Sequence, residues 1–79
     1  MDERTYINQL KKDLNKLKNA INNKNLTLDC EYCEIEADIE SIYLWKEASK
    51  EEVERIIAGY DFNDDTKSRL LYRVNKIYN

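Results

Sequence analysis

The sequence predicts an all-α fold: an antiparallel αα-hairpin (about 3–22 and 28–48), then a short helix (50–58) and a terminal helix (64–78), together a small helical bundle. Proline is absent and glycine occurs once among 79 residues, so the usual helix breakers are nearly missing. Apolar residues recur at spacings of three and four in each segment, as in amphipathic helices. The apolar stripes of the first two segments also mirror each other.

The mirrored stripes specify how the hairpin closes. The first is Ile7, Leu10, Leu14, Leu17 and Ile21; the second is Leu28, Tyr32, Ile35, Ile39 and Ile42. Two antiparallel helices that turn between Lys24 and Asn25 bring these stripes into register, so that Leu14 faces Ile35.

Residues beside the seam should then meet across it. We expect Lys11 to pair with Glu36, and Tyr6 to meet Trp45 as an aromatic anchor at the open end. The same register sets Asp13 opposite Asp38, a like-charge mismatch that it does not explain.

Helix signals also delimit the last two helices. Ser49 and Glu52 form a capping box for the third helix, and Gly59 follows its last apolar residue as a stop signal. One of residues 63–65 caps the fourth helix.

The second helix carries a further stripe of small and apolar residues on its outer side. Its members are Cys30, Cys33, Ala37, Ser41 and Leu44. One interpretation makes this helix central, with the last two helices buried on the stripe. The other leaves the stripe open for self-association through Cys30, Cys33, Ala37 and Leu44, because small residues allow another helix to approach closely.

Composition bounds the class of protein. The chain is 42% hydrophobic and 37% charged with a net charge of −3, and we expect one helical domain over residues 1–79. No apolar run reaches the roughly 18–20 residues of a membrane span, and the N-terminus lacks a signal-peptide core. We therefore expect a cytoplasmic protein with reduced cysteines.

Sequence motifs for a metal-binding or catalytic site are weak. Histidine is absent, and Cys30 and Cys33 provide only two of the four ligands of a structural zinc site, so we expect no metal and no cofactor. Residues 61–65 resemble the start of a calcium-binding loop, but Thr66 and Tyr72 stand where that loop needs Gly and Glu. No general base has an evident partner, so we do not expect an enzyme.

The densest acidic run gives the leading functional hypothesis. It consists of Glu31, Glu34, Asp38 and Glu40. Such a helix can imitate nucleic-acid phosphates, which predicts a non-catalytic protein-binding module acting on a protein partner of unknown identity. One form is a phage or mobile-element inhibitor of the anti-defence or anti-CRISPR type, since the favoured residues Asn, Lys, Ile and Tyr have AT-rich codons.

Two alternatives remain open. A basic stripe on the last helix, formed by Arg69, Tyr72, Arg73 and Lys76, would suit a small DNA-binding or regulatory domain. The acid excess argues against nucleic-acid binding. The third class is a structural coiled-coil module that forms a homodimer.

Overall fold

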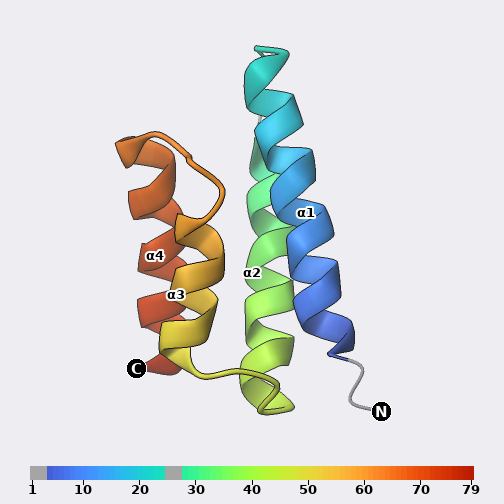
Figure 1. Cartoon of the computed structure of the whole chain (residues 1–79), viewed down its shortest axis with the longest axis vertical. Helices are drawn as coiled ribbons and strands as arrows, with labels where there is room; N and C mark the ends of the chain where they lie inside the picture. Colours follow the sequence, from blue (N-terminus) through green and yellow to red (C-terminus); the bar gives the residue numbers. More distant parts are fainter. Residues whose placement is uncertain (1–3, 25–27) are drawn as a thin grey trace.

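The computed structural model describes residues 4–24 and 28–79, which form four helices: α1 (Thr5–Asn22), α2 (Asp29–Leu44), α3 (Lys50–Ala58) and α4 (Asp64–Tyr78). Figure 1 shows α1 and α2 side by side and antiparallel, with α3 and α4 beside α2. The predicted fold class is confirmed, and the described residues contain no strand. The predicted hairpin turn at Asn25, and the first predicted helical residue, lie outside the described residues.

The hairpin seam forms most of the core. The buried apolar cluster comprises Ile7, Leu10, Leu14, Leu17, Tyr32, Ile35, Ile39, Ile42, Val53, Ile57, Phe62, Leu70 and Val74. Two polar contacts across the seam agree with the predicted register: Lys16 lies 3.8 Å from Glu34, and the Asp13 carboxyl group lies close enough to Asp38 to raise its pKa. The fully buried Leu14 and Ile35 lie between these contacts in sequence and belong to the same cluster.

Helix α4 packs on the flank of α2, and not on the outer stripe of α2. The Arg73 guanidinium lies 4.8 Å from the centre of the Tyr32 ring, and the Tyr43 and Tyr78 rings meet edge to face at 5.1 Å. The ion pair predicted for Glu36 is also wrong, because Glu36 pairs with Arg73 at 3.3 Å instead of with Lys11.

The interpretation that buried the outer stripe of α2 under the last two helices is therefore wrong. Cys30, Cys33, Ala37 and Leu44 are all exposed. The face of α2 that carries these residues points away from the seam. Helix α4 instead contacts the flank of α2, through Arg73 on Tyr32 and Tyr78 on Tyr43.

Helix α2 ends four residues earlier than predicted. The Glu47 N–H donates to the Ile42 carbonyl at 3.0 Å and the Lys46 N–H to the Tyr43 carbonyl at 3.3 Å, the two bonds of a Schellman motif. Lys46 accordingly adopts a left-handed conformation, with φ of 54°. This turn takes Trp45 out of the seam, where it had been expected to meet Tyr6, and leaves it 71% exposed.

The predicted caps of α3 and α4 are present. Ser49 Oγ accepts from the Glu52 N–H at 3.2 Å, and Asn63 Oδ1 accepts from the Thr66 N–H at 2.8 Å. Gly59 follows α3 as predicted but has an ordinary helical φ of −70°, and the left-handed residue of this connection is Asp61.

No helix within residues 4–24 and 28–79 is both long and apolar enough to cross a membrane.

Candidate functional site

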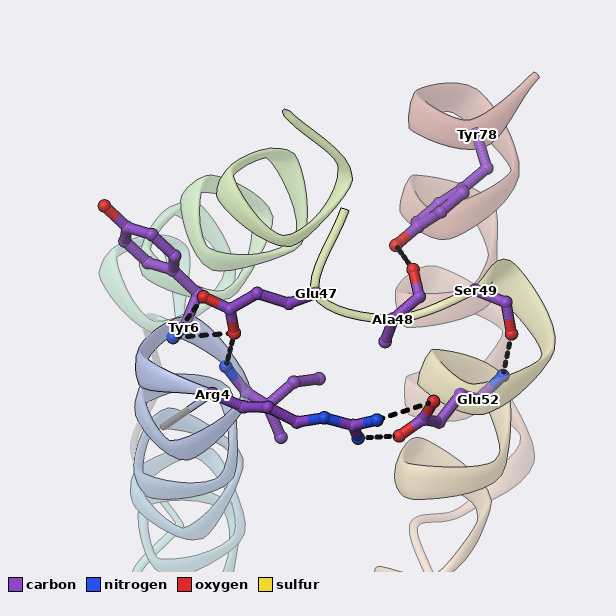
Figure 2. A network of polar contacts seen from close by, with 8 residues as sticks. Arg4, Tyr6, Glu47, Ala48, Ser49, Glu52 and Tyr78 are labelled. Atoms are coloured by element: carbon purple, nitrogen blue, oxygen red, sulfur yellow. Dashed lines mark hydrogen bonds and ion pairs between the residues drawn. The ribbon is translucent and has the colours of Figure 1, made fainter. Parts of the chain in front are cut away.

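One end of the bundle collects the start of α1, the α2–α3 turn, the start of α3 and the end of α4 (Figure 1). A polar network fixes this end, as Figure 2 shows. The Glu47 carboxylate accepts the backbone N–H groups of Tyr6 and Ile7 at 3.0 Å each. It thereby supplies the α1 N-terminus with a negative charge, which the helix dipole favours.

The rest of the network joins the other elements. Arg4 forms an ion pair and hydrogen bond with Glu52 in α3, and the Tyr78 hydroxyl donates to the Ala48 carbonyl at 3.0 Å (Figure 2). The α2–α3 turn is thus held from both sides, which gives the surface around it a fixed shape.

Two adjoining hollows lie at this end. The larger, of about 690 Å³, is lined by Tyr43, Leu44, Lys46, Glu47, Ala48, Ser49, Glu52 and Tyr78. The smaller, of about 340 Å³, lies between α2 and α4 and is lined by Glu36, Glu40, Tyr43, Leu44, Lys76 and Ile77. Tyr43 and Leu44 line both hollows, and we call the two hollows together the depression.

Three large apolar side chains in succession are exposed at this end of the bundle, and the first two of them line the depression. Leu44 and Trp45 are each 71% exposed and Tyr43 is 45% exposed. Tyr72, 65% exposed, lines a third hollow that shares Lys76 with the smaller one. We call Glu40, Tyr43, Leu44, Trp45 and Lys76 the end surface.

The four acidic residues of α2 that were predicted to form one binding surface do not share one face of the helix. Asp38 is buried beside Asp13 of α1, and Glu34 pairs with Lys16 of α1. Glu40 belongs to the end surface, on the side of α4. A helix turns about 100° per residue, so Glu31 and Glu40 point in opposite directions around α2.

Two cations of the predicted basic stripe already form ion pairs within the protein. Arg73 pairs with Glu36 and stacks on Tyr32, and Arg69 pairs with Asp65 at 3.2 Å. Lys76 is exposed and lines the smaller hollow. Two of the three cations that would have to meet phosphates already face carboxylates, which weakens the case for a nucleic-acid surface.

The two cysteines are free thiols on the exposed outer side of α2. Residues 4–24 and 28–79 contain no group of three or more His, Cys, Asp or Glu side chains placed to hold a metal ion.

Sequence reasoning missed Glu47 and did not predict the exposure of Tyr43 and Trp45. The signal for Glu47 was indirect: Arg4, at the N-cap position of α1, has no side-chain acceptor to cap the helix, so an acceptor from elsewhere was needed. Trp45 was expected to meet Tyr6 across the seam because α2 was extended beyond Leu44.

Comparisons with models of known protein families, with curated proteins and with solved structures found no match to this chain. The geometry of the chain alone therefore carries the functional argument.

Proposed function

We propose that this protein is a non-catalytic protein-binding module that binds its partner through the end surface. The observation that carries the proposal is the 71% exposure of both Leu44, which lines the depression, and Trp45, the residue that follows it. The core is complete without these two side chains. Clustered exposed apolar residues of this size mark interaction sites in soluble proteins.

The residue types also suit a binding site. Trp and Tyr are the side chains that most often dominate the energy of protein–protein interfaces, because they bury a large area with few rotatable bonds. The polar network beneath the depression holds the turn in place, so little ordering is needed on binding.

The surface chemistry defines the class of partner segment. An apolar or aromatic side chain would suit the surface of Tyr43 and Leu44, while Glu40 of α2 and Lys76 of α4 line the smaller hollow as one acid and one base. A partner helix or loop with one apolar anchor between a basic and an acidic residue would match this arrangement. The acidic contribution predicted from sequence is then made by Glu40.

The test is affinity capture with a double variant, Leu44→Ser with Trp45→Ser. Both side chains are mostly exposed, so the variant should keep the helical circular-dichroism spectrum and midpoint of the wild type. We expect a partner captured by the wild type to be lost. The matched control is Lys12→Ser with Asn15→Ser, exposed positions on α1, which should retain it.

Trp45 is the only tryptophan of the chain, so its fluorescence reports on this surface directly. Adding the captured partner should shift the emission to shorter wavelength as the indole leaves water. Capture that survives the double variant, or an emission spectrum that the partner leaves unchanged, would move the interface elsewhere.

An inhibitor of the type expected from the sequence is one form of this proposal. It would be identified by loss of the captured partner's own activity on adding the wild-type chain, but not the double variant. A stable homodimer that hides Leu44 would instead make a second copy the partner, as in the predicted self-association through Cys30, Cys33, Ala37 and Leu44.

A further inference from the structure

Two carboxyl groups are buried against each other between α1 and α2. Asp13 is 2% exposed and Asp38 is 8% exposed, and the two carboxyl groups lie close enough for Asp13 to raise the pKa of Asp38. The amide of Gln9 donates to Asp13 at 3.3 Å, and the Lys16 ammonium lies 4.0 Å from Asp13.

The charges facing this pair do not neutralise it. Lys16, on α1, is shared with Glu34 of α2 at 3.8 Å, so one solvent-facing cation stands among three carboxyl groups. A buried like-charge pair of this kind is costly unless a proton removes one of the charges.

We propose that Asp13 and Asp38 form a proton-binding site in which one proton is shared across the α1–α2 interface, so that closing the hairpin takes up a proton at neutral pH.

The unpaired atom of the site supports this assignment. With both groups ionised, the buried Asp38 Oδ2 has no hydrogen-bond partner among the described residues. A proton on Asp38 turns its carboxylate into a donor, for which an oxygen of the adjacent Asp13 side chain is the acceptor. The hydrogen bond then joins the two helices where two charges would push them apart.

Burial supplies the main driving force for protonation. It raises the pKa of Asp38 from 3.8 to about 8, helped by hydrogen bonding to Asp13 and by the negative charges of Asp13 and Glu34, and opposed by Lys16. In the unfolded chain, Asp38 has the ordinary pKa of an aspartate side chain. Between about pH 4 and pH 8 the folded state therefore holds a proton that the unfolded state has released.

The sign of the pH effect follows. Since the folded state binds more protons in this window, stability falls as pH rises, and it levels off above the folded-state pKa. One proton taken up on folding corresponds to an unfolding constant that increases about tenfold per pH unit. This proton uptake therefore makes the folded hairpin more stable in mildly acidic solution than at neutral pH.

The test compares urea unfolding of the wild type and Asp38→Asn between about pH 5 and pH 7. The asparagine keeps the size of the side chain and its donor to Asp13, but it cannot titrate. We expect the wild-type unfolding constant to rise about tenfold per pH unit relative to the variant. Glu40→Gln, an exposed carboxylate on the same helix, should retain the wild-type dependence.

A second measurement does not depend on the variant folding. The carboxyl ¹³C resonance of Asp38 in the folded wild-type protein should titrate well above the ordinary range of aspartate, whereas Asp13→Asn should bring the midpoint down. A wild-type midpoint in the ordinary range, or equal pH dependence of the wild type and Asp38→Asn, would overturn the proposal.

Discussion

The carboxylate of Glu47, in the turn after α2, accepts the backbone N–H of Tyr6 at 3.0 Å and so caps a helix 41 residues earlier in the chain. The same oxygen accepts the N–H of Ile7 at 3.0 Å. Arg4, at the N-cap position of α1, makes no side-chain cap of its own. The turn that follows α2 therefore caps the start of α1. This contact joins the first and last residues of the α1–α2 hairpin at its open end.

Replacing Glu47 by Ala should lower the free energy of unfolding by about 1–2 kcal/mol, because α1 loses its cap and the negative charge at its N-terminus. Urea denaturation followed by circular dichroism measures the change. The control is Glu54→Gln in α3, which should change stability by less than about 0.5 kcal/mol. Equal effects from both variants would show that the Glu47 contacts add nothing.

Leu14→Ala should cost roughly 2–4 kcal/mol, since Leu14 is fully buried in the seam and its truncation leaves a cavity. Asn15→Ala, one residue on and exposed, is the matched control and should be nearly neutral. A Leu14→Ala protein as stable as the control would be incompatible with the predicted hairpin register.

Lys46→Gly should stabilise the protein by about 0.5–1 kcal/mol, because a left-handed φ of 54° is strained for lysine and free for glycine. Lys46→Ala separates this backbone effect from loss of the charge, and it should not stabilise. Thermal unfolding of the three proteins ranks them, and a glycine variant less stable than wild type would contradict the assigned turn.

Arg73→Ala should destabilise by about 1–2 kcal/mol, since it removes the ion pair with Glu36 and the packing on Tyr32. Arg69→Ala removes a largely exposed side chain and should stay within about 0.5 kcal/mol. Comparable denaturation midpoints for both variants would mean that the α2–α4 contact does not depend on Arg73.

Duplex DNA should not be bound near physiological salt, because the net charge is −3 and two of the three cations of the α4 stripe face carboxylates. A mobility-shift assay with random-sequence DNA checks this. Retardation at micromolar protein that disappears in Lys76→Ala would instead favour the nucleic-acid alternative. Lys76 is the suitable probe, since removing Arg73 also disturbs the fold.

Local sequence signals sufficed for most of the fold. Apolar spacing within 7–21 and 28–42 depends only on helical geometry, so the hairpin seam and its register could be predicted. Ser49 and Asn63 cap the helices that follow them through bonds that span three residues, which short-range patterns reveal well.

The candidate site was harder to predict because it depends on where α2 ends. The Schellman turn at Lys46 uses lysine where glycine is the usual signal, so nothing in the composition marked a stop before Ala48. Extending the helix placed Trp45 in the seam, whereas the actual end at Leu44 leaves Leu44 and Trp45 exposed together.

The sequence by itself determined the four helices, the inward stripe of each and the pairing of α1 with α2, because these follow from periodicity and from bonds between near neighbours. Only the tertiary structure decided which side of α2 receives α4, and with it the ion pair of Arg73. It also decided the burial of Asp38 between α1 and α2 and, through the end of α2, the exposure of Leu44 and Trp45. Those outcomes depend on how whole helices compete for the same buried area. The spacing of residues along one helix does not contain that information.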